Sequence, residues 1–176
     1  MNKPLQLLLV VETSSEEKTD AIYINEVIKK YFDVSGVNIK FVPLGGKKHY
    51  KDKKIIGKIN NYTKMFHKFT NGETITIYFI DTDSVNREYK TGSFFKNLCT
   101  FVEQSRYELV WFCKNAENVF LNLEPETLDN KTQMAKAFAA ENKINNISKE
   151  NLSKSIIELN CSNILTVLTK YLNRKD

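Results

Sequence analysis

The chain has 176 residues and a mass of 20.4 kDa, a length that favours one globular domain, with or without an appendage. Its composition, 41% apolar and 27% charged with only six glycines and three prolines, excludes disordered, collagen-like and linker-like chains. The 26 basic and 21 acidic side chains leave a net charge of +5, a balance that favours polyanionic partners.

The sequence carries no sign of membrane insertion or secretion. No run of about 18 apolar residues is present, so no membrane span is expected. The apolar stretch 4–11 follows only one lysine and lacks a small-residue cleavage site, which favours a buried strand over a signal peptide. Cys99, Cys113 and Cys161 are too widely spaced for a disulfide framework or zinc ribbon, and they indicate reduced thiols in a cytoplasmic protein.

Apolar runs with strand character alternate with helical patterns along the first two-thirds of the chain. The strand-like runs span 7–11, 37–44, 74–80 and 107–113. The helical patterns span about 19–32, 53–69 and 94–102. Strands that alternate with helices predict crossover connections. We therefore expect an α/β fold with a mainly parallel sheet of about four strands and helices on both faces.

The pattern changes after residue 113, where the strong strand signals end. Helical or helix-compatible stretches follow at about 115–122, 130–141, 149–158 and 162–173. We therefore divide the chain into an α/β domain, 1–123, and a helical C-terminal extension, 124–176, packed on the same domain as a cap.

Acidic side chains end the first and third of the expected strands. Glu12 follows the first run, and Asp81 and Asp83 follow the third. Ligands of open α/β sheets bind beyond the carboxyl ends of the strands, and adjacent parallel strands would bring these acids to one edge. Crowded carboxylates need a cation, so the combination predicts a Mg²⁺ or Mn²⁺ site that positions a phosphodiester and activates a water. Each motif alone is more often a turn or a helix cap.

The densest basic run, 45–54, directly follows the second strand. Its lysines would hold phosphates and its tyrosine would stack on a base, whereas a mobile, solvated lysine loop is the alternative interpretation. The segment is not a P-loop, because the GxxxxGK[ST] spacing is absent. The candidate nucleic-acid-binding residues are Gly45, Gly46, Lys47, Lys48, Tyr50 and Lys51.

The order of these motifs resembles the signature of Toprim domains, which occur in topoisomerases, primases and nucleases of the overcoming-lysogenization-defect type. Glu12 matches the glutamate, the 45–46 pair the glycine, and Asp81 and Asp83 the DxD motif. The segment 17–23 is also similar to an acidic Lys-Thr and aromatic segment of RloB-like proteins of phage-defence loci. The resemblance covers roughly residues 6–120.

The resemblance implies roles for individual residues. Asp81 and Asp83 would hold Mg²⁺, and Glu12 would be a metal ligand or move protons. Glu117, which follows the fourth strand, matches an acid of RloB-like proteins and would be a further ligand, although an exposed acid in the first turn of a helix is an equal alternative. Thr13 stands where the family usually has glycine, and extra residues before the Lys-Thr segment leave Glu16 or Glu17 as alternatives to Glu12.

We therefore expect a cytoplasmic nuclease, dependent on Mg²⁺ or Mn²⁺, that acts on DNA or RNA in phage defence or a restriction-associated locus. A homodimer is compatible with this expectation. The alternative is a non-catalytic Toprim-like partner that binds an ATPase or nucleic acid, because the missing glycine leaves room for lost catalysis. A metal-dependent nucleotide-sugar transferase, which also places DxD after a strand, ranks below both. The chain is short to hold both a donor and an acceptor region.

Overall fold

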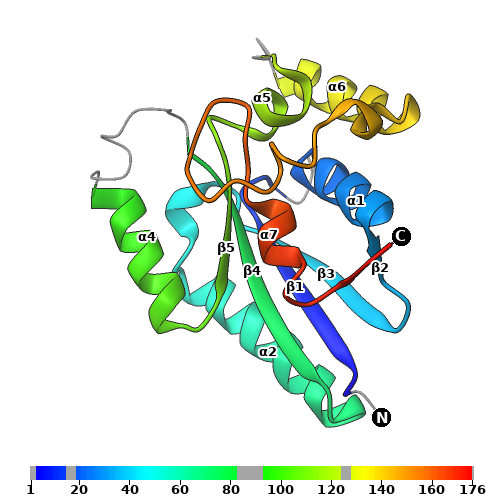
Figure 1. Cartoon of the computed structure of the whole chain (residues 1–176). Helices are drawn as coiled ribbons and strands as arrows, with labels where there is room; N and C mark the ends of the chain where they lie inside the picture. Colours follow the sequence, from blue (N-terminus) through cyan, green and yellow to red (C-terminus); the bar gives the residue numbers. More distant parts are fainter. Residues whose placement is uncertain (1–2, 15–18, 83–92, 124–127, 176) are drawn as a thin grey trace.

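The computed structural model describes residues 3–14, 19–82, 93–123 and 128–175, in which a parallel sheet is covered by helices on both faces (Figure 1). The strand order is β3-β1-β4-β5. This arrangement confirms the expected α/β fold with a mainly parallel sheet of about four strands. The four strands are β1 (Leu5–Val11), β3 (Val37–Pro43), β4 (Glu73–Asp81) and β5 (Glu108–Phe112).

The central strand β1 pairs in parallel with β3 on one side and β4 on the other. Its residues 7–11 are at most 2% exposed, because helices cover both faces of the sheet. The register places Val11 opposite Pro43 and Phe79, so the three strands reach one edge together. The strand β4 continues for two residues to Asp81, which pairs with Phe112 of β5.

Each face of the sheet has its own apolar core, because successive side chains of a strand point to opposite faces. Leu7 and Leu9 of β1 belong to one core, and Leu8 and Val10 belong to the other. The first core contains residues of α1 (Thr19–Tyr31), α5 (Ala116–Leu121), α6 (Leu128–Ala140) and α7 (Ile164–Leu168). The second contains residues of α2 (Lys53–Thr70) and α4 (Ser93–Gln104).

The connections place a topological switch point between β1 and β4. The connection from β1 to β3 carries α1 over one face, and the connection from β3 back across the sheet to β4 carries α2 over the other. In open α/β sheets of this kind, ligands bind beyond the carboxyl ends of the strands at the point where the strand order reverses. A ligand site is therefore expected at the ends of β1 and β4.

The C-terminal segment shares the first core with α1. The ring of Tyr23 stacks on Phe120 with ring centroids 5.1 Å apart, and it meets the edge of Phe138 at the same distance. These contacts join α1, α5 and α6 beside the carboxyl edge of the sheet. Side chains of α6 are therefore close enough to reach the strand ends.

The prediction of a helix at 149–158 is wrong, since the chain forms turns and bends there. Short side chains bond the local backbone instead: the Ser153 hydroxyl donates to the Lys149 carbonyl at 2.8 Å, and the Ser148 hydroxyl accepts from the Glu150 N–H at 3.1 Å. Such bonds compete with helical ones.

The other described elements are the 3₁₀ turns η1 (Lys47–His49) and η2 (Lys143–Asn146) and an antiparallel pair of β2 (Phe32–Asp33) with β6 (Asn173–Arg174).

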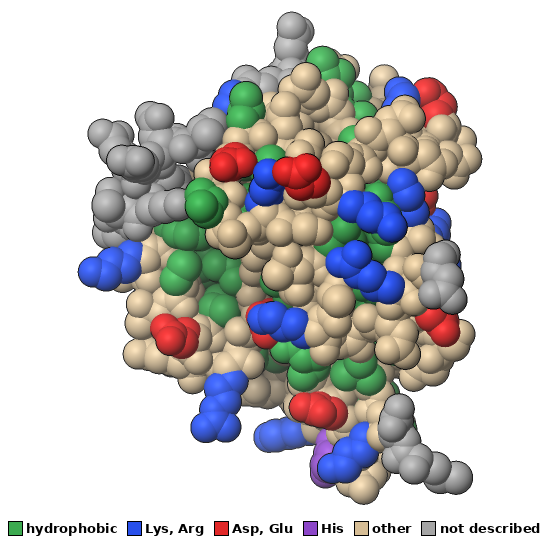
Figure 2. Space-filling view, in the orientation of Figure 1, with side chains coloured by type: hydrophobic (Ala, Val, Ile, Leu, Met, Phe, Trp, Pro, Cys, Tyr) green, Lys and Arg blue, Asp and Glu red, His purple; other side chains and the backbone are tan. Residues whose placement is uncertain are grey.

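None of the helices within the described ranges is both long and apolar enough to cross a membrane. Figure 2 shows acidic and basic side chains interspersed over the face of the molecule that is drawn in front. That face therefore carries no field of a single sign.

Candidate functional site: a buried carboxylate cluster

Glu12 and Asp81 lie together at the switch point of the sheet. The backbone N–H of Asp81 donates a hydrogen bond to the Glu12 carboxylate, with 3.3 Å between N and Oε2. The bond joins the end of β1 to the end of β4, as expected when neighbouring parallel strands end at one edge. Asp83, the second acid of the DxD motif, and the alternatives Glu16 and Glu17 lie outside the described residues.

Two further carboxylates, from Asp20 and Glu117, complete what we call the carboxylate cluster: Glu12, Asp20, Asp81 and Glu117. Asp20 lies in the first turn of α1, and its Oδ2 accepts a hydrogen bond of 3.2 Å from the Thr13 N–H. Glu117 lies in the first turn of α5. Both are buried, with exposed fractions of 5% and 1%. The negative charges of the other three members all raise the pKa of Asp81, so each of them lies close enough to influence that carboxyl group.

Burial raises the pKa of three members of the cluster, Glu12, Asp20 and Asp81, and repulsion between carboxylates adds to the rise for Asp20 and Asp81. Burial is the main cause that raises the pKa of Asp20 to about 7, and the charges of Glu117 and Glu12 add to it. The same causes raise the pKa of Asp81 well above its ordinary value. Burial also raises the pKa of Glu12, although the Lys47 charge and the Asp81 N–H oppose that rise. Keeping all four ionised is therefore costly unless positive charge is supplied.

Lys131 of α6 brings one positive charge to the cluster. Its Nζ lies 3.6 Å from Oε2 of Glu117. The same charge lowers the pKa of Glu12, Asp20 and Asp81. Oε1 of Glu117 is buried without a hydrogen-bond partner in the described structure. Glu117 is thus not the exposed acid of the alternative interpretation, and one of its oxygens is available to a cation.

The glycine pair after β3 borders the same edge. Gly45 and Gly46 have φ angles of 71° and 118°, a region that favours glycine. Their N–H groups donate to the carbonyls of Thr13 and Glu12, at 3.4 and 2.9 Å. This loop delivers Lys47 to the cluster, where its charge lowers the pKa of Glu12. Lys48 and Lys51 are exposed.

The prediction that Tyr50 stacks on a base is wrong. Its side chain is buried, at 4% exposure. The ring packs edge-on against Phe94 and Phe101 of α4, with centroids 5.7 and 5.2 Å apart. The Tyr50 carbonyl also accepts a hydrogen bond of 2.9 Å from the Tyr78 hydroxyl. Tyr50 therefore anchors the basic loop to the second core, and its ring face is not offered to a ligand.

The chemistry of the cluster suits Mg²⁺ or Mn²⁺. All of its donors are carboxylate oxygens, the ligand type these ions prefer. Within the described residues, no group of three or more histidine, cysteine or acidic side chains is arranged to hold a metal ion. Mg²⁺ sites that act on phosphates commonly use one or two carboxylates, with waters and substrate oxygens as the other ligands. Glu12 and Asp81 fit such a site.

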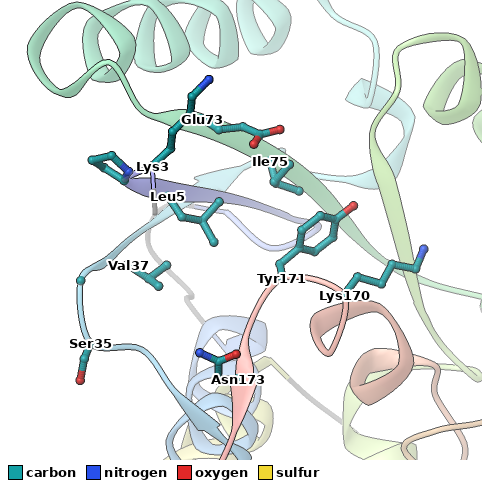
Figure 3. A pocket seen from close by; sticks show the side chains of 11 residues that line it. Lys3, Leu5, Ser35, Val37, Glu73, Ile75, Lys170, Tyr171 and Asn173 are labelled. Carbon is teal, nitrogen blue, oxygen red and sulfur yellow. The ribbon is translucent and has the colours of Figure 1, made fainter. Parts of the chain in front are cut away.

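A cavity lies at the opposite edge of the sheet from the carboxylate cluster, beside the amino ends of β1, β3 and β4 (Figure 3). Its volume is about 710 Å³. Lys170 and Tyr171 line it, but both bond Glu108, at 2.8 Å from Nζ to Oε2 and 2.6 Å from the hydroxyl to Oε1. Glu73 is the one acid among its lining residues, and Glu108 already binds Lys170 and Tyr171, so the cavity is a weaker candidate than the carboxylate cluster despite its size.

Sequence reasoning missed Asp20 and Lys131 as members of the site. Asp20 had a usable signal, because it lies in the first turn of the helix that follows β1, which begins at the same edge as the strand ends. Lys131 had none, since only the packing of α6 on α1 brings it to Glu117.

No protein-family model, curated protein or solved structure matches this chain. The Toprim resemblance accordingly rests on the order of the motifs alone.

Proposed function

We propose that this chain is a nuclease dependent on Mg²⁺ or Mn²⁺ that cleaves phosphodiester bonds of nucleic acid at the carboxylate cluster. The observation that carries the proposal is the gathering of four acids from β1, α1, β4 and α5 at the switch point. A stable fold alone does not favour such crowding, because unpaired buried charge is destabilising. A site that binds a divalent cation and a phosphate would account for the crowded carboxylates.

Individual residues would have different roles in the cleavage of the phosphodiester bond. Glu12 and Asp81 would hold the ion, whose role is to polarise the phosphate and lower the pKa of a bound water. Asp20, held by the Thr13 N–H, would keep the edge negative and orient the loop that carries Glu12. Lys47 and Lys131 approach the cluster from the glycine loop and from α6, where ammonium groups favour an incoming phosphate.

The Toprim resemblance supports the same proposal from the sequence. It supplies the expectation of a nuclease in phage defence or a restriction-associated locus. The structure adds a parallel sheet whose first and third long strands carry Glu12 and Asp81 side by side. These two lines of support are independent, because motif order does not determine which strands are neighbours.

A second candidate, a non-catalytic partner of an ATPase or nucleic acid, is favoured by two observations. Within the described residues the acids do not form a complete set of three metal ligands. Thr13, at the position where Toprim domains usually have glycine, also has a buried hydroxyl oxygen without a hydrogen-bond partner in that part of the chain. A protein of this kind would bind nucleic acid without cleaving it.

Cleavage assays separate the two candidates. The wild-type chain is incubated with labelled DNA and RNA in Mg²⁺, in Mn²⁺ and in EDTA, beside the variants Glu12→Gln and Asp81→Asn. The matched control is Glu103→Gln, which removes an exposed carboxylate on α4. We expect cleavage by the wild-type chain and the control that EDTA abolishes, and a loss of at least about a hundredfold in both site variants.

The possible results favour different candidates. Robust cleavage that survives both Glu12→Gln and Asp81→Asn would show that the assigned cluster is not the active site. Salt-sensitive binding of nucleic acid without cleavage in any metal would favour the non-catalytic partner.

A further inference from the structure

The excess positive charge of the chain is concentrated in one segment. Residues 36–72 contain nine lysines and one acid, Asp52, which leaves 17 basic and 20 acidic side chains in the rest of the chain. This segment comprises β3, the basic loop and α2. The net charge of +5 therefore reflects a strongly basic strip on a molecule that is otherwise slightly acidic.

The helix α2 carries much of this charge, and it contains no acidic residue. Lys54, Lys58 and Lys68 are spaced by four and ten residues, which places them on one side of the helix. Lys54 and Lys68 are exposed, and Lys58 is half-buried. Within the described residues, no carboxylate forms an ion pair with any of the three, so their charge is not neutralised by the fold. We call these three residues the lysine stripe.

A pocket of about 450 Å³ joins the lysine stripe to the edge that carries the carboxylate cluster. Its lining includes Ser14, two residues beyond Glu12, together with Gly45 of the glycine pair and with Lys54 and Lys58 of the lysine stripe. The one acid among its lining residues, Asp52, is 2.7 Å from the His49 ring nitrogen. The pocket therefore presents positive charge beside the proposed metal site.

The stripe extends away from the pocket along the molecule. Figure 1 shows α2 running from the carboxyl edge of the sheet to the opposite edge, near the N-terminus. The 14 residues from Lys54 to Lys68 span about 21 Å at a rise of about 1.5 Å per residue. One strand of a duplex advances about 3.4 Å per phosphate, so the stripe matches about six nucleotides.

We propose that this pocket and the lysine stripe bind the sugar–phosphate backbone of a nucleic acid that runs from the carboxylate cluster along α2. The inference rests on the proposed function for the identity of the polyanion. The contacts are to phosphates, so the binding is independent of sequence. The face in front in Figure 2, with its interspersed charges, offers no comparable track.

An anionic membrane is a different polyanion, and the structure favours nucleic acid over it. The helix buries Ile55 and Ile59 against the sheet and exposes Met65 and Phe69 at its far end beside Lys68, at 46% and 73%. The apolar surface that could enter a bilayer is therefore confined to two side chains at the end distant from the pocket. The pocket at the start of the stripe also adjoins acids suited to phosphodiester chemistry. Acidic side chains do not contribute to the binding of an anionic membrane surface.

The test compares two triple variants with the same loss of charge. The first is Lys54→Gln, Lys58→Gln and Lys68→Gln. The control is Lys3→Gln, Lys96→Gln and Lys136→Gln, which removes three exposed lysines elsewhere. Binding of labelled duplex DNA, single-stranded DNA and RNA is measured by fluorescence anisotropy between about 50 and 200 mM salt, in EDTA. Circular dichroism verifies that all the variants fold.

We expect the stripe variant to bind the preferred nucleic acid at least about tenfold more weakly at about 100 mM salt, with a salt slope smaller by about 3. The control should remain within about twofold of the wild-type chain. Equal binding by both triple variants would overturn the inference while leaving cleavage, and thus the proposed function, intact. Tight binding through the stripe without cleavage would keep the inference and remove the nuclease.

Two other results would also count against the inference. Absence of any nucleic-acid binding by the wild-type chain at low salt would overturn both the inference and the proposed function. Loss of binding to phosphatidylserine vesicles in the stripe variant, with nucleic-acid binding unchanged, would assign α2 to a membrane surface instead.

Discussion

The backbone N–H of Asp81 lies 3.3 Å from Oε2 of Glu12, so the acid that ends β1 is held by the end of the neighbouring strand β4. The bond orients the Glu12 carboxylate and lowers its pKa against the effect of burial. A glutamine at position 12 retains an oxygen that accepts this bond, whereas an alanine does not. Glu12→Gln therefore tests the charge with the least change in geometry.

The ion pair between Lys131 and Glu117 should stabilise the fold. Lys131→Met leaves the buried Glu117 carboxylate without its counter-charge, and we expect the free energy of unfolding at pH 8 to fall by about 1–3 kcal/mol. The lysine side chain is 33% exposed, so solvent screening keeps the effect below that of a fully buried pair. Urea denaturation in EDTA measures the change.

The double variant Lys131→Met with Glu117→Gln is the control for this pair. Removing both charges leaves no unpaired carboxylate at position 117, so the double variant should be more stable than Lys131→Met alone. Strictly additive losses would show that the two side chains do not interact.

Burial of Asp20 should make stability depend on pH. Its pKa rises from 3.8 in the unfolded chain to about 7 in the folded protein. Between those values the folded state holds a proton that the unfolded state has lost, so the contribution of Asp20 to stability is greatest below about pH 4 and falls as pH rises from about 4 to 7. Asp20→Asn should flatten that fall in urea denaturation with EDTA present. Glu103→Gln should keep the wild-type slope, and an unchanged slope in Asp20→Asn would refute the assignment.

Two glycine-to-alanine changes should have opposite signs. Gly46 has a φ of 118°, and its N–H approaches the Glu12 carbonyl, so Gly46→Ala should cost about 1–3 kcal/mol through backbone strain. Gly57 lies inside α2 with nothing within 4 Å of an added Cβ. Gly57→Ala should therefore stabilise the protein by about 0.5–1 kcal/mol. Thermal denaturation of the two variants gives both signs, and a stabilising Gly46→Ala would mean that the loop relaxes without strain.

The fold was readable from the sequence because strands buried on both faces need continuous apolar runs. The run at 7–11 became the central strand, and the acids at its end and after 74–80 reached one edge. Local sequence patterns did not predict the environment of a side chain where contacts with distant segments of the chain determine it. Tyr50 sits in a lysine-rich loop that suggests exposure, yet α4 packs against its ring. Lys131 joins the cluster only through the packing of α6 on α1.

The C-terminal segment shows a second limit of local patterns. Its apolar spacing at 149–158 is compatible with a helix, but serine side chains satisfy nearby backbone groups and favour turns. Helix patterns are most reliable where an apolar stripe has a surface to cover, as α2 has in the second core. The stretch at 149–158 has one fully buried residue, Leu152, and thus little to gain from a helix.

Calorimetric titration with Mn²⁺ measures whether the carboxylate cluster binds a divalent cation. The titration compares the wild-type chain with Asp81→Asn and with the control Glu103→Gln, all without nucleic acid. We predict that Mn²⁺ binds the wild-type chain and the control alike, and that Asp81→Asn weakens the binding at least about tenfold. Equal Mn²⁺ affinity in all three proteins, or no binding by the wild-type chain, would show that the cluster is not a metal site.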